Sequence, residues 1–289
     1  MKPQFDHLLR ASFFMFFDHT LLDKGQTFDN IDSGNLYLTF DPRRDSMDTW
    51  AGNLRQWVTD SSISGATIAS GVNYSGSFYN RNSGIAIDYA NGRILASSGR
   101  FSQSGGPVST AFAAKQINVY TSSETDEQII FDKPYIFLSG IPIFEQSNGL
   151  PSDIRPYPSV YINYYPGLNV PYEFGVISNL KCKMRAIILA DSDYMLDGVM
   201  GICRDMNKKH FLILDANKLP YTSKGDLKSG IYNYNTLVNN LVGADPMRIA
   251  YISNVSTSKM SNEANKAVNK SVLVGIADFN LEIIRNPYN

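Results

Sequence analysis

The chain contains 289 residues, with 26 Lys and Arg against 27 Asp and Glu, so its formal net charge is −1 at pH 7. Charged residues make up only 18% of it, below the roughly 25% of an average soluble domain. Hydrophobic residues reach 43%, while Ser and Asn number 30 and 25. This composition predicts a folded chain with a polar, nearly neutral surface. It excludes a disordered tail and argues against nucleic-acid binding through a concentrated basic face.

Cysteine usage and hydropathy limit the class of protein further. Cys182 and Cys203 both lie in apolar segments, so neither a disulfide framework nor a zinc site is predicted. The most apolar run near the N-terminus, residues 13–17, is far shorter than the ~20 residues that span a bilayer. We therefore expect a soluble protein made in the cytosol, with no membrane segment. Its length fits one large domain or two ordinary ones.

Residues 1–29 are predicted to hold an amphipathic aromatic helix. Apolar residues recur at intervals of three and four between Phe5 and Phe17, and Lys24-Gly25 ends the pattern. That interval is the period of one helix face. We expect this face to pack on the protein's own core, with a neighbouring subunit as the alternative.

Residues 30–144 are predicted to form an antiparallel β-rich part. Asn91-Gly92 stands between two apolar runs and predicts a hairpin, because both residues tolerate positive φ. A short helix is expected over residues 49–58, with Trp50, Leu54 and Trp57 on one side. Strands are expected at residues 36–40, 85–89, 93–96, 116–120 and 128–131, and loops at 61–79 and 99–108.

Residues 145–289 are predicted to form a mixed α/β part, which can be continuous with the middle part. The expected order is a central strand at 185–190, a helix after 191–193, a strand at 210–214, and late strands at 248–252 and 271–279. Residues 256–270 are expected to be an exposed loop or a short surface helix. The predicted fold class is therefore α+β and β-rich. It has an N-terminal helix, a sandwich or barrel-like middle part, and a C-terminal mixed sheet with one or two packed helices.

A search for catalytic chemistry finds few candidates. His7 and His19 are too far apart on the N-terminal helix to share a site, and His210 is expected at the surface. The chain has no Gly-x-Ser-x-Gly elbow, Walker loop or Gly-x-Gly-x-x-Gly turn after a strand, so no nucleophile or phosphate cradle is predicted. We therefore predict no catalytic, cofactor-binding or metal-binding residues, and no enzymatic activity.

One constellation offers an alternative. An apolar strand ends in Asp191-Ser192-Asp193, with Asp197 four residues further on. This Asp-x-Asp resembles the divalent-metal motif of nucleotide-sugar glycosyltransferases, which implies a metal-dependent nucleotide-sugar enzyme. Helix capping explains the same residues, because Asp or Ser at the N-cap satisfies free backbone N–H groups, and capping is the interpretation we favour.

A run of tyrosines supports a third hypothesis. Tyr161, Tyr164, Tyr165 and Tyr172 lie close together in the sequence and could form a carbohydrate-stacking surface in a β-rich adhesin. Tyrosine is equally frequent in cores and protein interfaces, because its apolar ring has a polar tip.

Three short stretches resemble tailed-bacteriophage virion structural proteins, and more narrowly the neck or head-to-tail connector proteins of long-tailed phages. They are residues 5–10 with the aromatic residues that follow, residues 87–94 of the predicted hairpin, and residues 274–279 of the last predicted strand. The resemblance implies a non-enzymatic subunit that works as an oligomeric ring between portal and tail, through which DNA passes. It assigns no site residues.

This resemblance also implies partners and location. The expected partners are copies of the chain itself and the adjacent virion proteins, which are the portal or connector and the tail terminator or tail tube. DNA contact would be transient and non-specific. We expect the protein to be made in the host cytoplasm and to reside in the virion. A low-charge surface rich in Tyr and Asn agrees with this, because interface cores are enriched in aromatic residues and depleted in charge.

Overall fold

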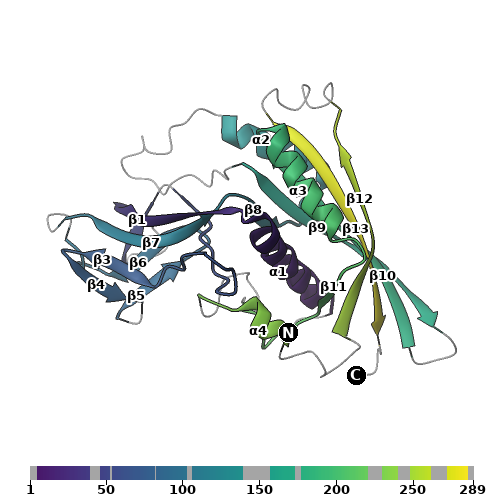
Figure 1. Ribbon diagram of the computed structural model, residues 1–289, viewed down its shortest axis with the longest axis horizontal. Coiled ribbons are helices and arrows are strands. Elements are labelled where there is room, and N and C mark those ends of the chain that lie inside the picture. The colour runs from purple at the N-terminus through teal and green to yellow at the C-terminus, as the bar shows by residue number, and fades with distance from the viewer. Residues whose placement is uncertain are drawn as a thin grey trace.

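The computed structural model describes residues 5–39, 46–52, 54–81, 83–102, 106–138, 157–172, 177–220, 230–239, 248–261 and 272–285. Two β-sheets and the helices packed on them form the architecture (Figure 1). The predicted fold class, α+β and β-rich with an N-terminal helix, is confirmed.

The N-terminal helix α1 (Phe5–Gly25) packs on the core of its own chain. Its Phe13 ring lies 5.6 Å from the Phe211 ring and 5.2 Å from the Phe279 ring, both edge-on. Phe16 stacks on Phe211 at 5.4 Å. Such pairs add to the free energy that area burial alone provides. The aromatic face therefore packs as we expected.

A seven-stranded antiparallel sheet follows, in the order β4-β3-β7-β1-β2-β6-β5. Its long strand β1 pairs with β7 on one side and β2 on the other. Strands from both ends of the sheet, including Val72, Tyr79 and Ile85, contribute to one cluster around Trp57. The sheet therefore curls around its core and is nearly closed. The strands are β1 (Phe28–Thr39), β2 (Met47–Ala51), β3 (Gly71–Tyr74), β4 (Ser77–Asn80), β5 (Ile85–Asp88), β6 (Arg93–Ser97) and β7 (Val108–Lys115).

The predicted hairpin is confirmed, and the structure explains why residue 92 is a glycine. β5 and β6 pair in register from Ile85↔Ala96 to Asp88↔Arg93. Gly92 has a φ of +62°, and a Cβ there would collide with the carbonyl oxygen of Leu54. Only glycine combines that backbone conformation with so close an approach.

Several local predictions are wrong, and among them residues 71–74 and 77–80 of the predicted loop at 61–79 form β3 and β4. Residues 49–58 form no helix, because Trp50 belongs to β2 and Trp57 follows in irregular chain, stacked on Phe112 at 4.3 Å. Residues 128–131 form no strand, because they lie in α2 (Asp126–Leu138). Thr125 and Gln128 exchange side-chain-to-backbone hydrogen bonds of 2.9 and 3.3 Å. This reciprocal pattern is a capping box that begins a helix.

The second sheet has six strands in the order β11-β12-β13-β10-β9-β8. All neighbours are antiparallel except β8 and β9, so the sheet is mixed as predicted. Residues 256–259 belong to β12 rather than to a loop, and residues 262–271 lie outside the described part. The strands are β8 (Asn118–Thr121), β9 (Ser159–Tyr172), β10 (Ile177–Ala190), β11 (His210–Leu212), β12 (Ile249–Lys259) and β13 (Leu273–Arg285).

Alternation along β10 divides the second sheet into two covered faces. Its Cys182, Met184 and Ala186 belong to the cluster that includes α1 and α3 (Asp193–Asp205). The intervening Ile187 and Leu189 belong to a second cluster with α2. Successive strand residues point to opposite faces, and because both faces are covered here, residues 186–190 of β10 are all apolar. A short helix, α4 (Tyr234–Asn239), lies beside α1.

Two buried polar contacts connect α1 to the first sheet and its flanking loop. Lys115 Nζ on β7 lies 2.7 Å from Asp18 Oδ2, and the two side chains are 9% and 2% exposed. His19 Nδ1 lies 2.7 Å from Asp60 Oδ2, and Asp60 also accepts hydrogen bonds from the backbone N–H groups of Ser62 and Tyr234. Because α1 also packs on the second sheet, these contacts place the two sheets relative to each other.

We predict that Lys115→Met destabilises the protein by about 3–5 kcal/mol, because it leaves the Asp18 carboxylate buried without a counter-ion. Urea denaturation followed by circular dichroism measures the change. Lys24→Met is the matched control, because Lys24 and Asp23 form an exposed pair worth about 0–1 kcal/mol. Equal losses in the two variants would contradict the proposed role of the buried pair.

Candidate functional site

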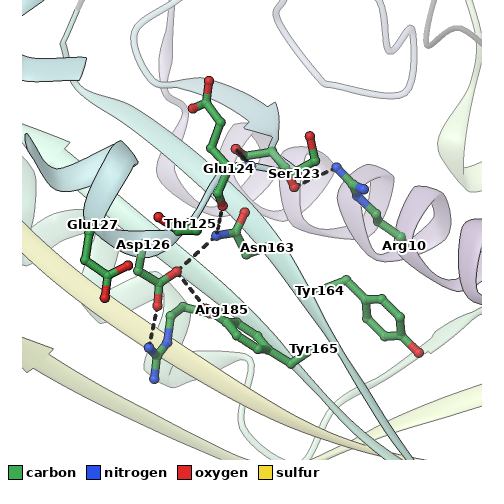
Figure 2. A pocket seen from close by; sticks show the side chains of 11 residues that line it. Arg10, Ser123, Glu124, Thr125, Asp126, Glu127, Asn163, Tyr164, Tyr165 and Arg185 are labelled. Atoms are coloured by element: carbon green, nitrogen blue, oxygen red, sulfur yellow. Dashed lines mark hydrogen bonds and ion pairs between the residues drawn. The ribbon is translucent and has the colours of Figure 1, made fainter. Parts of the chain in front are cut away.

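A pocket of about 610 Å³ lies where β8 ends beside β9. Pairing between the two strands runs from Asn118↔Ser159 to Thr121↔Ile162. The chain then turns through residues 122–125 into α2, whereas β9 continues to Tyr172. The pocket is lined by this turn, the start of α2, β9, Arg185 of β10 and Arg10 of α1 (Figure 2).

Arg185 is the centre of a charge network on one side of the pocket. Its Nε and Nη2 atoms bond both carboxylate oxygens of Asp278, at 2.6 and 2.8 Å. Its Nη1 atom bonds Asp126 Oδ2 at 2.6 Å. One guanidinium therefore joins β10, β13 and the first turn of α2, and the bidentate fork fixes its orientation.

Asp126 accepts two further hydrogen bonds from β9. Tyr165 Oη donates to its Oδ1 at 2.7 Å and Asn163 Nδ2 donates to the same atom at 3.0 Å. Lys183 Nζ lies 4.9 Å from the centre of the Tyr165 ring and 3.6 Å from Asp278 Oδ2. Figure 2 shows the Asp126 carboxylate between Arg185 and the side chains of β9.

These contacts shift the pKa values of the network. Burial raises the pKa of Asp126, but hydrogen bonds from Tyr165, Arg185 and Asn163 outweigh it and hold that pKa below its ordinary value. The pKa of Asp278 is likewise lowered, because Arg185 outweighs burial. Burial, with the Asp126 carboxylate, raises the pKa of Tyr165 to about 12. All these groups therefore keep one protonation state near neutral pH, which does not suit a general acid or base.

The other side of the pocket is formed by α1. Arg10 Nη2 donates to the carbonyl oxygen of Ser122 at 2.8 Å, and Tyr164 Oη bonds Asp6 Oδ1 at 3.0 Å. Asn163 lies between the two sides and is 6% exposed. Its Oδ1 atom is buried and has no hydrogen-bond partner. The pocket is therefore lined by polar and charged groups on both sides.

The predicted Asp-x-Asp residues Asp191 and Asp193, with Asp197 after them, are all exposed. Asp193 and Asp197 both contact Lys259 Nζ, at 3.2 and 2.8 Å, and their side chains are 76% and 58% exposed. Ser192 is the N-cap of α3 and accepts a hydrogen bond from Met195 N, as the capping interpretation expects. Among the described residues, no group of three or more His, Cys, Asp or Glu could hold a metal ion.

The tyrosine run forms no single stacking surface. Tyr161 is buried against α2, whereas Tyr164 and Tyr165 alternate along β9. Tyr164 reaches Asp6 on α1 and Tyr165 reaches Asp126 on α2. Strand alternation thus separates neighbouring rings. The Tyr172 side chain lies outside the described residues.

The remaining candidates lie outside the lining of the pocket. His19 bonds Asp60, and His210 is an exposed residue of β11, as predicted for a surface position. Both cysteines are free and buried. Burial raises the pKa of each thiol to about 12, so neither is a reactive thiolate.

Asp126, Arg185 and Asp278 belong to no motif that the sequence indicated. The sequence does mark two of these residues as unusual, because Arg185 begins an apolar strand and Asp278 interrupts another. Opposite charges at such half-buried positions favour pairing across strands. Their register, Arg185↔Asp278, was not accessible from the sequence.

A comparison with known protein families finds no matching family model, and no curated protein matches the sequence. No helix in the described part of the chain has the length and hydropathy required to cross a membrane.

We predict that the network stabilises the protein more at neutral than at acidic pH. Asp126 has a lowered pKa in the folded state. Its contribution is therefore complete above the unfolded-state pKa and is lost as the pH falls through the folded-state value. The difference in unfolding free energy between the wild type and Asp126→Asn should shrink from about pH 6 to about pH 2. Urea denaturation across this range measures it.

Asp193→Asn provides the control, because Asp193 is an exposed acidic residue at the start of a different helix. Its effect on unfolding free energy should stay small at every pH. A difference for Asp126→Asn that is the same at pH 6 and pH 2 would contradict the role given to the carboxylate.

Proposed function

We propose that the chain is a structural subunit of a tailed-phage virion, of the neck or head-to-tail connector kind, which forms a ring through which DNA passes. The observation that carries this proposal is the edge of the second sheet. β9 continues through residues 163–172 after β8 has ended. No strand among the described residues pairs with it there. The edge of a sheet is where pairing with another chain takes place, and this supports contact with a neighbouring subunit.

The arrangement of the two sheets supports head-to-tail contacts. The first sheet lies at one end of the molecule in Figure 1, and the long strands of the second sheet lie at the other. Contacts between unlike surfaces of successive copies generate a ring when the rotation closes. A subunit with one surface at each end suits such contacts.

The surface chemistry supports the same proposal. Tyr37, Phe78 and Tyr194 are 59%, 56% and 85% exposed. Exposed aromatic residues on a surface of low charge are typical of protein interfaces rather than of solvated faces. The proposed partners are other copies and the adjacent virion proteins, namely the portal or connector and the tail terminator or tail tube.

The polar pocket supports a structural rather than a catalytic role. The Asp126, Arg185 and Asp278 charges are paired with one another, and their pKa shifts favour the charged forms that the pairs require. We therefore propose no enzymatic activity. With a net charge of −1, contact with DNA would be transient and non-specific.

We predict that the purified protein forms a closed ring, alone or when mixed with virion heads or tails from its own phage. Light scattering should give a mass that is an integer multiple of the protomer mass, and electron microscopy should show an annulus. The protein at low concentration is the control, because assembly depends on mass action. A protein that stays monomeric and joins no particle would contradict the proposed function.

A further inference from the structure

Arg10 is a half-buried cation in the wall of the pocket beside β9. Its Nη2 atom donates to the Ser122 carbonyl oxygen at 2.8 Å, which holds the guanidinium against the turn before α2 (Figure 2). Its other N–H groups form no hydrogen bond or ion pair with the described residues. Burial lowers the pKa of Arg10, and no carboxylate of the described residues offsets that effect. Such a guanidinium favours an anion that supplies the missing counter-charge and acceptors.

Two acidic residues close to Arg10 are engaged elsewhere. Asp6 lies one helical turn before Arg10 on α1, but its Oδ1 atom accepts a hydrogen bond from Tyr164 Oη at 3.0 Å. Glu124 lines the pocket, but its Oε1 atom lies 2.7 Å from Lys133 Nζ. Neither carboxylate therefore neutralises Arg10.

The second arginine of the lining shows the contrast. Arg185 bonds Asp278 through two nitrogen atoms and Asp126 through a third. Hydrogen bonds to Asp278 and Asp126 raise its pKa, the direction opposite to the shift of Arg10. The charge of Arg185 is thus satisfied within the chain. An anion that enters the pocket gains most from contact with Arg10.

The rest of the lining selects what the anion is attached to. Among the described residues, no aliphatic side chain lines the pocket, whereas Ser123 and Thr125 supply hydroxyl groups. Glu127 is exposed, forms no ion pair with a described residue and lies across the pocket from Arg10 in Figure 2. It repels a second negative charge and accepts hydrogen bonds. Hydroxyl groups both donate and accept, so a molecule with one anionic end and several hydroxyl groups suits this wall.

We propose that this pocket binds a small hydroxylated organic acid of the sugar-acid class, with its carboxylate on Arg10 and its hydroxyl groups toward Ser123, Thr125 and Glu127. A volume of about 610 Å³ lies within the range of small-molecule sites, about 300–1,000 Å³. The planar fork of an arginine matches the geometry of a carboxylate. The inference goes beyond the proposed function, because it does not depend on whether the chain forms a ring.

Isothermal titration calorimetry of the full chain with three probes tests the class of molecule. Glucuronate carries both the carboxylate and the hydroxyl groups, glucose lacks the carboxylate, and inorganic phosphate lacks the sugar ring. We expect saturable binding of glucuronate, with glucose and phosphate each at least about tenfold weaker, because each loses one set of hydrogen bonds. Glucose or phosphate that binds as tightly as glucuronate would overturn the assignment, and so would a wild-type protein that binds no glucuronate.

Arg10→Gln tests the residue that receives the carboxylate. It should weaken glucuronate binding by about tenfold to a hundredfold, the effect of losing a hydrogen bond to a charged group, and leave the weak binding of glucose unchanged. Arg204→Gln is the matched control, because Arg204 is an exposed arginine of α3 outside the pocket. Equal glucuronate affinity in the wild type and Arg10→Gln would overturn the role of Arg10.

A second variant keeps the proposal testable if Arg10→Gln disturbs the packing of α1. Ser123→Trp fills the rim of the pocket and leaves Arg10 in place, and it should abolish glucuronate binding. Ser258→Trp, at an exposed position on β12, is the control and should bind as the wild type does. Circular dichroism checks that each variant is folded. Glucuronate binding that survives in folded Ser123→Trp would place the site elsewhere and overturn the proposal, whatever the outcome of the ring experiment.

Discussion

The placement of both sheets depends on α1, which has one apolar face and two buried polar contacts. Its phenylalanines pack on Phe211 and Phe279 of the second sheet, while Asp18 pairs with Lys115 of the first. A buried carboxylate is tolerated only where a counter-charge lies close by. The Asp18–Lys115 pair therefore permits only a narrow range of positions for β7 relative to the helix, whereas hydrophobic contacts alone would permit sliding.

A charge network also positions α2 on the other face of the second sheet, the face that α1 does not cover. Apolar residues of β10 and β13 bury α2 along part of that face, and Arg185 with Asp278 then interrupts the apolar surface. Asp126 binds this pair through the first turn of α2. Acidic residues also suit a helix N-terminus, because the helix dipole favours negative charge there. The network thus fixes where α2 begins, and with it the turn that forms the wall of the pocket.

Elements with strong local signals were predictable from the sequence. The helix at the N-terminus, the Asn91-Gly92 hairpin and the strand at 185–190 each follow from a period or a turn signal that neighbouring residues reinforce. The failures at 49–58 and 128–131 have one cause, which is that short apolar segments fit either period. Trp50 is a strand residue because β1 and β6 pair with it on both sides. The sequence around Trp50 contains no information about these distant pairing partners.

The pocket was beyond prediction for a related reason. Its residues come from α1, the turn before α2, β9 and β10, and they meet only through the parallel pairing of β8 with β9. That pairing also determines where the pocket lies, because β8 ends at Thr121 while β9 continues to Tyr172. A longer β8 would continue along β9 toward Pro166 and fill the space that the pocket occupies. The difference in length between two neighbouring strands is therefore the feature that leaves room for the pocket beside β9.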